Sequence, residues 1–356
     1  MRVAITHPYS WPEVRRGAER IVVETARSLA VRGHEVTILT AGSKPGRSTT
    51  DGVTTIRLRR LFENPVRHER SFAWRIVPYL VKGRYDAVHA MMRRDAYWST
   101  RSRRLGGHRV VFDEMGIPYR DYWTQAGEAG LFGYLAKQVD VYGCMSHFAL
   151  DVLRKDWGRE GDLIPGGVRL DQFDIAKERE PVPTVLLSGA LDEPRKGLAL
   201  LLEAMALVVA DVPNIKLWLS GPGDPSAIIA AAPDAARKTV EVLPLGTPED
   251  QGLRYQRAWA TCLPSKHDSF GMVLIESLAC GTPIVVLNDA APPQLVTPKT
   301  GAIAEPDNPV SLAAALRQGL DLGARPETAR HCRDYATQFD WDTGIAPLLE
   351  RLYTAP

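Results

Sequence analysis

The chain has 356 residues, of which 45% are hydrophobic and 24% charged, and its formal net charge is +2; this is the composition of a soluble globular protein, long enough for two domains. No apolar run reaches the length needed to cross a bilayer, and the opening residues MRVAITHPYSW predict a β-strand rather than a signal peptide. The cysteines Cys144, Cys262, Cys280 and Cys332 form no CxxC pair, so neither structural disulfides nor a zinc site is expected, and a reducing cytoplasm fits best.

Short β-branched runs alternate with amphipathic runs of helical length along the first half of the chain. We expect strands at residues 2–7, 35–40, 53–59, 86–90, 109–113 and 139–144, and a helix at residues 17–33 that ends at Gly33. This order predicts a parallel sheet with helices on both faces. The segment 70–84, RSFAWRIVPYLVKGR, mixes cations with aromatic residues, which suits either a membrane surface or a half-buried helix.

Residues 163–183, LIPGGVRLDQFDIAKEREPVP, interrupt the alternation and have the Pro, Gly and charge content of a linker. The alternation restarts with a strand at residues 184–190. It continues with helices at residues 197–210, 248–259 and 309–322 and strands at residues 215–220 and 260–263. We therefore predict an α/β fold of two doubly wound domains, residues 1–166 and 167–335, with a C-terminal helix in residues 336–356 that packs back on the first domain. Ligands of such sheets bind beyond the carboxyl ends of the strands, so the cleft between two facing domains is the expected site.

The stretch 265–286, SKHDSFGMVLIESLACGTPIVV, carries two carboxylates across the start of a predicted helix. The unpaired first-turn amides are those of Phe270, Gly271, Met272 and Val273, and with the helix dipole they suit a phosphate. Glu276, one turn later, would repel a phosphate but could accept hydrogen bonds from a ribose diol. Asp268, ahead of the helix, could bind sugar hydroxyls, and the set then describes a sugar nucleotide. In the plainer interpretation Asp268 is a helix cap and Glu276 is solvated.

Two other strand-to-helix turns carry cations. The turn SGALDEPRKGL, residues 188–198, places Arg195 and Lys196 where they could reach a diphosphate. The loop PYSWPEVRRGAER, residues 8–20, holds Arg16 and Gly17, and the glycine allows a ligand to approach the helix closely. A basic surface turn would explain the first of these equally well. Together the three turns indicate one diphosphate ligand in the cleft.

Four segments resemble the retaining GT-B glycosyltransferases of family 4, which include the bacterial phosphatidylinositol mannosyltransferases. The segments are PYSWPEVRRGAERIVVETARSLAVRGHEVTILT, LIPGGVRLDQF, LDEPRKGLALLLEAM and HDSFGMVLIESLACGTPIV. The resemblance covers nearly the whole chain, with Asp268 in place of the first Glu of the family's E-x7-E signature. It implies a GT-B fold of two Rossmann-like domains, an acceptor domain followed by a donor domain. It also implies the retaining transfer of a sugar from a UDP- or GDP-sugar to an acceptor hydroxyl, with no cofactor and no metal ion.

The resemblance implies roles for individual residues. Lys196 would hold the donor diphosphate, Asp268 the sugar hydroxyls and Glu276 the ribose, and the leaving phosphate would take the acceptor's proton. The other implied donor contacts are Gly17 and Arg16 from the first domain, Arg195, the first-turn amides of Ser269, Phe270, Gly271, Met272 and Val273, and a base pocket lined by Leu245 and Thr247.

Three further departures from the family pattern matter. Ala190 stands where the family often has an arginine, so we expect Arg195 or an arginine of the first domain to substitute. Asp113 stands where the family often has a histidine, and we expect it to act in catalysis by orienting the acceptor or the sugar. Arg16 and Gly17 replace the usual Gly-Gly pair.

The charge is unevenly distributed. Residues 1–165 carry a net charge of about +9 and residues 166–356 about −7, counting Lys and Arg against Asp and Glu. The acceptor is unknown. The basic half suggests an anionic or membrane-borne acceptor and peripheral contact with the inner face of the membrane, although a solvated basic face or a small-molecule acceptor is the alternative. No nucleic-acid motif accompanies the charge.

Two other functions use the same cleft: a sugar-nucleotide 2-epimerase and a non-catalytic sugar-nucleotide binder. No set of acid and base groups suited to an epimerase is evident. The one Asp-x-Asp pair, Asp340 and Asp342, lies in the C-terminal tail, where Asp342 more simply caps a helix, so no metal site is expected.

Overall fold

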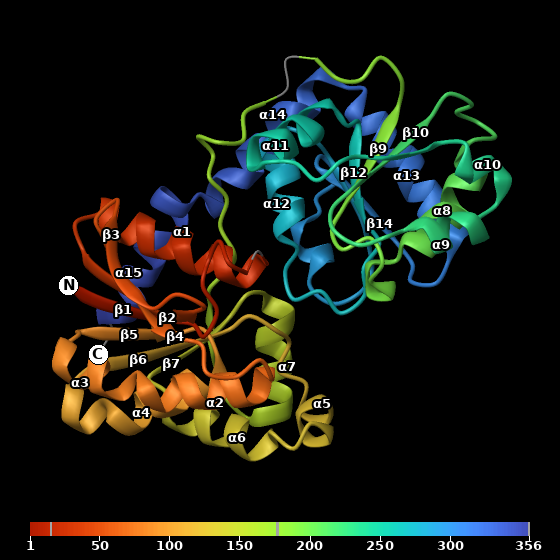
Figure 1. The fold of residues 1–356 in the computed structure, drawn as a ribbon. Coiled ribbons are helices and arrows are strands. Elements are labelled where there is room, and N and C mark those ends of the chain that lie inside the picture. The colour runs from red at the N-terminus through yellow and green to blue at the C-terminus, as the bar shows by residue number, and fades with distance from the viewer. Residues whose placement is uncertain (15, 176–177, 355–356) are drawn as a thin grey trace. The chain divides into compact units, whose positions relative to one another are not determined.

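The computed structural model describes residues 1–14, 16–175 and 178–354 (Figure 1). The chain forms two compact units: the first comprises Met1–Gly167 and the chain from Trp341 onward, and the second comprises Val168–Asp340. Each unit is built on one largely parallel sheet covered by helices, which confirms the predicted α/β class. Residues 176–177 of the predicted linker and residues 355–356 of the predicted C-terminal helix lie outside the described residues.

The sheet of the first unit has the strand order β3-β4-β2-β1-β5-β6-β7-β8. Its strands are β1 (Arg2–Thr6), β2 (Glu35–Gly42), β3 (Gly46–Thr50), β4 (Val53–Arg59), β5 (Ala87–Ala90), β6 (Arg109–Glu114), β7 (Val141–Cys144) and β8 (Asp162–Leu163). All neighbours are parallel except β3, which pairs antiparallel with β4. The central register aligns Ile5 with Ile38 and with His89, so the carboxyl ends of β1, β2 and β5 meet at one edge.

The sequence analysis missed β3, the edge strand. Every residue of β3 is exposed, so no apolar alternation marks it. The sequence feature that could have revealed this hairpin is the Asp51-Gly52 turn. Both residues have positive φ, 51° and 78°, which a two-residue hairpin turn requires and the Asp-Gly pair favours.

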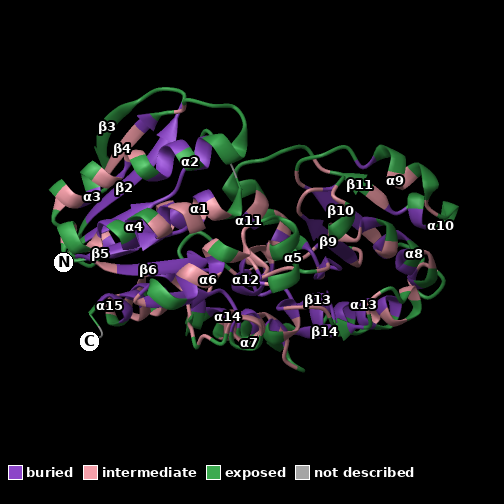
Figure 2. Cartoon of the chain, turned by 90° about the horizontal axis from the view of Figure 1, so that it is seen from below, coloured by how far each residue is buried: buried purple, intermediate pink, exposed green. Residues whose placement is uncertain are grey.

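Eight helices of the first unit are described. They are α1 (Gly17–Val31), α2 (Pro65–Arg75), α3 (Val77–Gly83), α4 (Arg93–Gly106), α5 (Arg120–Gln125), α6 (Ala129–Gln138), α7 (His147–Trp157) and α15 (Ala346–Thr354), the last preceded by a π-helical turn at Trp341–Ile345. Phe72, Ile76 and Leu80 are fully buried against the sheet with Leu39 and Val88. The segment 70–84 is therefore a pair of half-buried helices, and its outer face remains open to solvent (Figure 2).

The terminal helix α15 is fastened to the first unit by side chains. Glu350 accepts two hydrogen bonds from Arg32, at 2.7 and 2.8 Å, and lies 2.8 Å from His34 Nε2. The Tyr353 hydroxyl lies 2.7 Å from His89 Nδ1 in β5. The sequence placed the start of this returning segment at residue 336. In the structure the change of unit falls between Asp340 and Trp341, because α14 still packs on α12 in the second unit.

The sheet of the second unit is parallel throughout, in the order β11-β10-β9-β12-β13-β14. Its strands are β9 (Thr184–Ser188), β10 (Lys216–Ser220), β11 (Val240–Val242), β12 (Ala260–Leu263), β13 (Ile284–Leu287) and β14 (Gly301–Ala304). The sequence analysis missed β11 and β14. β11 is a largely exposed edge strand and β14 reads Gly-Ala-Ile-Ala, so neither carries a strong β-branched signal.

The helices of the second unit cover both faces of its sheet. They are α8 (Leu198–Val208), α9 (Ser226–Ala231), α10 (Asp234–Arg237), α11 (Pro248–Arg257), α12 (Met272–Ala279), α13 (Pro309–Gly323) and α14 (Pro326–Ala336), with 3₁₀ turns at Pro194–Lys196, Pro292–Leu295 and Thr337–Phe339. One apolar core joins α8 and α13 to the strands. All four cysteines are buried free thiols. None of the helices that the structure describes combines the length and apolarity of a membrane-crossing segment.

Glu350→Gln tests the anchor of α15. The hydrogen bond that Glu350 accepts from Arg32 lowers the pKa of Glu350 from its ordinary value of 4.5 to about 2. Because this pKa is lowered by folding, the stabilisation is present above about pH 4.5 and is lost as the pH falls toward 2. We expect the substitution to lower the free energy of unfolding by about 1 kcal/mol at pH 7, measured by denaturant titration. Glu35→Gln, which removes the exposed pair with Arg2, is the control and should change little. An equal loss in both variants would contradict an anchoring role.

Candidate active site

Two loops of the second unit meet at one edge of its sheet. β9 and β12 are parallel neighbours, so the turn after β9 and the loop after β12 leave the sheet on the same side. Lys196 Nζ lies 3.0 Å from Asp268 Oδ2, and Arg195 Nη1 lies 2.9 Å from Asp268 Oδ1. The structure thus brings together three of the predicted site residues, which are 72 and 73 positions apart in the chain.

Gly197 allows these loops to touch. It has φ 74°, and a Cβ at this position would lie 2.0 Å from the carbonyl oxygen of Pro264. The contact is closed by a hydrogen bond from the Lys266 amide to the Arg195 carbonyl, 3.0 Å long. Any larger residue at position 197 would therefore separate the cations from Asp268.

Asp268 is a charge partner and not a helix cap. Burial by itself would raise the pKa of Asp268, but Lys196, the Ser265 hydroxyl and Arg195 outweigh it and hold the pKa below its ordinary value. The carboxylate is therefore ionised at neutral pH, with two cations against its single charge. The residue before α12 is Gly271, and no side chain caps that helix. Glu193, which pairs with Arg195 at 2.8 Å, brings the cluster to two cations and two carboxylates, so a further anion would bind there by taking the place of a carboxylate.

The N-terminus of α12 faces this cluster with free donors. Gly271 has φ 101°, and the helix starts at Met272. Within the described part of the chain no group accepts a hydrogen bond from the amides of Phe270, Gly271, Met272 or Val273. The Phe270 ring is buried against Phe339, with ring centroids 5.6 Å apart. The backbone is thus held by packing while its first-turn amides stay available for an anion.

Glu276 is buried and not solvated, so the plainer interpretation of this residue is wrong. Its side chain is 3% exposed, and Oε2 accepts a 3.0 Å hydrogen bond from the Tyr255 hydroxyl. Burial and then the Glu276 charge raise the pKa of Tyr255 far above its ordinary value, so the phenol remains a donor. The Tyr255 hydroxyl also lies 3.4 Å from Ser188 Oγ, to which Gln251 donates at 3.2 Å.

Sequence reasoning missed this supporting network. Tyr255 and Gln251 are four residues apart and therefore share one face of α11, but nothing in the sequence shows that this face meets α12. The network holds the buried Glu276 carboxylate in one orientation, as expected of a carboxylate that binds a ligand.

The predicted base-pocket residues lie in the loop before α11. Leu245 is largely exposed, and the Thr247 hydroxyl accepts from the Asp250 amide at 3.3 Å, so it caps α11. Arg254 links this loop to β10: it donates to the Pro244 carbonyl at 2.6 Å and to Ser220 Oγ at 2.8 Å. A role of Leu245 and Thr247 in binding a base stays a prediction.

Arg16 and Gly17 begin α1 in the first unit. Arg16 pairs with the buried Glu19 at 2.5 Å, and its guanidinium lies 4.9 Å from the centre of the Tyr9 ring. A Cβ on Gly17 would meet no atom within 4 Å. The protein itself does not require a glycine there, and the space above it is open to a ligand. Contact of these two residues with the donor stays a prediction.

Asp113 points into the first unit. It is 3% exposed, and its Oδ2 lies 3.6 Å from Nε2 of His89, whose other nitrogen contacts Tyr353 of α15. The next residue, Glu114, ends β6 and accepts a 3.0 Å hydrogen bond from the Gly116 amide. Burial raises the pKa of Glu114 to about 7, opposed by that hydrogen bond. The sequence analysis considered Asp113 and overlooked Glu114, the carboxyl at the very end of the strand.

Ala190, where the family often has an arginine, contributes no charge, and Arg195 makes its ion pairs with Glu193 and Asp268. In the second unit the assembled set is Arg195, Lys196, Asp268, the first turn of α12 and Glu276. Among residues 1–14, 16–175 and 178–354, no group of three or more His, Cys, Asp or Glu is arranged to hold a metal ion.

Two family profiles match the chain, one on each half. The family profile described as "Glycosyl transferases group 1" matches residues 169–339, and that described as "Glycosyltransferase Family 4" matches residues 15–172. A phosphatidyl-myo-inositol mannosyltransferase of Mycobacterium tuberculosis is 28% identical over 99% of this chain and 96% of its own length.

Solved structures share the fold at lower identity. Sucrose-phosphate synthase from Thermosynechococcus elongatus has a TM-score of 0.81 at 20% identity, over 99% of this chain and 98% of its own. Anabaena HepE, solved in complex with UDP and glucose, has a TM-score of 0.75 at 15% identity, over 99% of both chains. At these identities the similarity concerns the fold alone.

Glu114→Gln should remove one pH dependence of folding. The folded pKa is about 7 against an ordinary 4.5, so between these values the folded state holds the proton more tightly than the unfolded chain. The parent's stability therefore falls as the pH rises through this window, by about 3 kcal/mol for this group. We expect the variant to gain stability relative to the parent between pH 5 and pH 8, measured by denaturant titration. Glu160→Gln, at an exposed position, is the control. A difference from the parent that did not change with pH would contradict the assignment.

Proposed function

Because this chain belongs to the GT-B glycosyltransferases of family 4, we propose that it moves a sugar from a UDP- or GDP-sugar to an acceptor hydroxyl, with retention of configuration and without a metal ion. The observation that carries the proposal is the cluster of Lys196, Arg195 and Asp268 beside the free first turn of α12, with the buried Glu276 one turn further. These groups supply the charges and hydrogen bonds that a sugar, a diphosphate and a ribose each need.

The donor diphosphate would replace Asp268 as the main partner of Lys196 and Arg195. Both cations are only partly exposed, so an anion there binds in a medium where charges interact more strongly than in water. Released from the cations, Asp268 would accept hydrogen bonds from the sugar hydroxyls. Glu276 would accept from the ribose, with Tyr255 holding its other side.

Sugar transfer would depend mainly on electrostatic stabilisation of the leaving group. The bond from the anomeric carbon to the diphosphate oxygen breaks, the acceptor oxygen bonds to the same face of that carbon, and the acceptor's proton passes to the departing phosphate. No protein nucleophile is needed. Lys196, Arg195 and the amides of α12 would bind the negative charge as it grows on the leaving diphosphate, the role that fixed donors have in other oxyanion sites.

For the acceptor we propose an anionic or membrane-borne molecule. The support is the excess positive charge of residues 1–165, which would attract an anionic leaflet by about 1 kcal/mol per basic residue near the surface. The name of the mycobacterial relative refers to a phosphatidyl-myo-inositol acceptor. Peripheral contact with the inner face of a membrane is part of this proposal. A neutral small molecule is the competing acceptor.

Incubation of the protein with radiolabelled UDP- and GDP-sugars tests the proposal. Transfer of label to an acceptor, or slow hydrolysis of the donor, supports a glycosyltransferase. Release of a sugar inverted at C2 would indicate a 2-epimerase, and binding without turnover would indicate a sugar-nucleotide binder. Either of the last two results would overturn the proposed reaction.

Glu276→Gln should weaken donor binding without loosening the fold. A glutamine keeps the shape and still accepts the Tyr255 hydrogen bond, but it loses the charge that strengthens hydrogen bonds from ribose hydroxyls. We expect about tenfold weaker binding of UDP- or GDP-sugar by calorimetry, with a melting temperature close to the parent's. Glu203→Gln, on the exposed face of α8, is the matched control. Donor affinity equal to the parent's would remove Glu276 from the ribose site.

Lys196→Ala should slow turnover far more than it lowers stability. The Lys196 charge would act most strongly on the diphosphate as it leaves, so we expect a fall in kcat on the order of 10²–10³, as when one oxyanion donor is removed. Steady-state kinetics with saturating donor measures this, and Lys238→Ala, at an exposed position after α10, is the control. If kcat stayed within a few-fold of the parent, the catalytic role would be wrong.

A further inference from the structure

A chain of hydrogen bonds in the second unit joins the loop before α11 to the carboxylate of Glu276. Its members, in order, are Arg254, Ser220, Gln251, Ser188, Tyr255 and Glu276. The distances between successive partners are 2.8, 2.7, 3.2, 3.4 and 3.0 Å. Arg254 also donates to the Pro244 carbonyl, 2.6 Å away. The chain therefore begins at the loop that carries Leu245 and Thr247 and ends at the buried acid predicted to bind the ribose.

The spacing of residues along α11 and the register of the sheet bring these side chains together. Arg254 and Tyr255 lie three and four residues after Gln251, so the three share one face of α11. Ser188 and Ser220 end β9 and β10 and are aligned in the parallel pairing of these strands. Because aligned residues of neighbouring strands point to the same side of a sheet, both hydroxyls reach the same face of α11, where Gln251 bridges them.

The arginine fixes the direction of the hydrogen bonds at its end of the chain. A guanidinium has donors and no acceptor, whereas a hydroxyl or an amide side chain can both donate and accept. Ser220 accepts from Arg254, so the hydrogen of Ser220 is directed to the carbonyl oxygen of the Gln251 side chain. The amide nitrogen of Gln251 then faces Ser188 and donates to its hydroxyl.

The carboxylate fixes the direction at the other end. An ionised carboxylate can only accept, and Glu276 accepts the single hydrogen of the Tyr255 hydroxyl. The Ser188 hydroxyl, which already accepts from Gln251, therefore donates toward the Tyr255 oxygen. Burial and the Glu276 charge raise the pKa of Tyr255, and hydrogen bonds from Ser188 and Gln251 oppose that rise, as expected of donors to the phenol oxygen. All donors thus point from the cation toward the carboxylate.

Without the guanidinium the middle of the chain has a second arrangement. The Gln251 side chain could turn over, so that its nitrogen donates to Ser220 and its oxygen accepts from Ser188. The Tyr255 hydrogen could then turn from the carboxylate to Ser188, and the carboxylate would lose its fixed donor. With the guanidinium in place, the turned amide leaves the hydrogen of Ser220 without an acceptor in the chain, at a side chain only 1% exposed, which is unfavourable.

A carboxylate held in one direction can separate ligands that differ by a hydroxyl. A site built to bind a hydroxyl rejects an analogue that lacks it, because a buried polar group is then left unpaired. Glu276 is buried, and the groups that set its direction are buried at Ser188, Ser220 and Tyr255. It follows that residues at the far end of the chain contribute to the selection of a ribose.

We propose that Arg254, Ser220 and Tyr255 are positioning residues that act through Glu276 to select a ribonucleotide over a nucleotide without ribose hydroxyls. The inference rests on the proposed binding of a UDP- or GDP-sugar and adds to it the residues that set this specificity. Arg254 has a further part, because its hydrogen bond to Pro244 ties the orientation of Glu276 to the loop predicted to hold the base.

Calorimetry with UDP or GDP, whichever the parent binds more tightly, and with the 2′,3′-dideoxy form of the same nucleotide measures the selection. We expect the parent to bind the ribonucleotide at least about tenfold more tightly, since each hydrogen bond to a charged acceptor contributes about that factor. In Ser220→Ala and Tyr255→Phe we expect this ratio to fall below about threefold, because Glu276 loses its fixed direction. The affinity for the dideoxy nucleotide should not change.

The possible failures are distinguishable. A ratio equal to the parent's in both variants would overturn the positioning role alone. Equal binding of the two nucleotides by the parent would overturn it together with the ribose role of Glu276. Binding of neither UDP nor GDP by the parent would overturn the proposed function as well.

Matched variants separate the chain from general effects of substitution. Tyr335→Phe removes a phenol that donates to the Gln294 carbonyl at 3.1 Å, and Arg237→Met removes an exposed arginine at the end of α10. Both should keep the parent's ratio, and an equal fall in them would contradict the proposal. Ser220→Thr retains the hydroxyl and should restore the ratio. Arg254→Met should lower the ratio and also weaken both nucleotides, because it releases the base loop. The melting temperature of each variant verifies that it is folded.

A double-mutant cycle tests whether Ser220 acts through Glu276. In the Glu276→Gln background, Ser220→Ala should change the affinity for the ribonucleotide by no more than about twofold, because the acid that Ser220 helps to orient is already gone. Lys196→Ala, whose charge is predicted to act on the diphosphate, should weaken binding by the same factor in both backgrounds. If Ser220→Ala weakened binding equally in the parent and in Glu276→Gln, Ser220 would act elsewhere and the proposal would be wrong.

Discussion

The parallel pairing of β9 with β12 is the contact on which the candidate active site depends. Val185 aligns with Ala260 and Leu186 with Thr261, so the chain leaves both strands at the same edge of the sheet. Only then can Lys196 and Asp268 meet, and only a residue without a side chain at position 197 lets the two loops approach closely enough. With the loops apart, a half-buried lysine and a half-buried aspartate would each lack the partner that offsets its desolvation.

The two acidic residues of the site are stabilised in different ways, and the difference suits different tasks. Asp268 is balanced by two cations, which another anion could take over. Glu276 is held by a neutral phenol inside a network that includes Ser188 and Gln251. A carboxylate of the first kind can change partners when a diphosphate arrives, whereas one of the second kind keeps its direction. The loop before α12 therefore provides an exchangeable charge, and α12, which packs on α11, provides a fixed hydrogen-bond acceptor.

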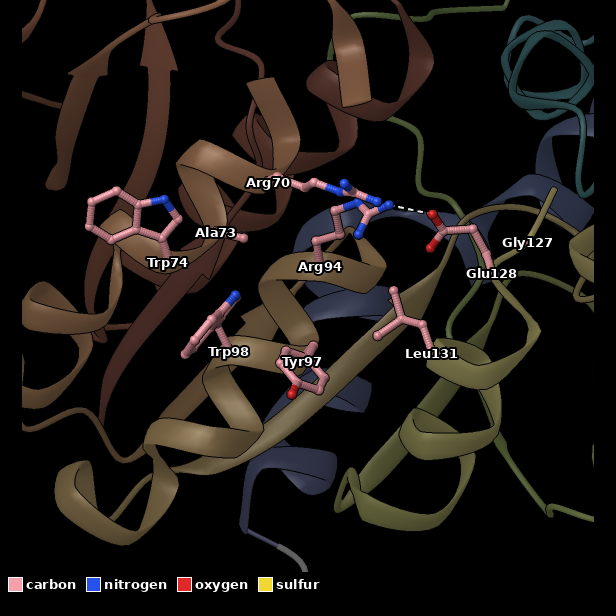
Figure 3. Close-up of a pocket in the computed structure, with 9 residues that line it drawn as sticks. All are labelled: Arg70, Ala73, Trp74, Arg94, Tyr97, Trp98, Gly127, Glu128 and Leu131. Atoms are coloured by element: carbon pink, nitrogen blue, oxygen red, sulfur yellow. Dashed lines mark hydrogen bonds and ion pairs between the residues drawn. The ribbon is translucent and has the colours of Figure 1, made fainter. Parts of the chain in front are cut away.

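The first unit carries its charges for other purposes. Arg32 and His34 hold Glu350 of the terminal helix, which ties the end of the chain to the unit where the chain began. Arg93 and Arg94 are largely balanced by Glu69 and Glu128. The net charge of about +9 in residues 1–165 is thus not uniformly available to a partner. The unbalanced charge is local, and Arg70 beside the indoles of α2 and α4 is one instance (Figure 3).

The sequence by itself determined the alternation of strands and helices, the two-unit α/β class, and the three turns that carry cations or free amides, because each depends on periodicity or on residues within one turn of the chain. The family was indicated separately, by the resemblance of four segments. The sequence did not reveal the exposed edge strand β3, whose only mark was the Asp51–Gly52 turn. Only the tertiary structure decided which groups meet. Tyr255 reaches Glu276 because α11 packs on α12, and Asp113 faces His89 because successive residues of β6 point to opposite sides of the sheet. Periodicity shows which face of an element is buried, but the partner that covers it is set by the packing of segments far apart in the chain.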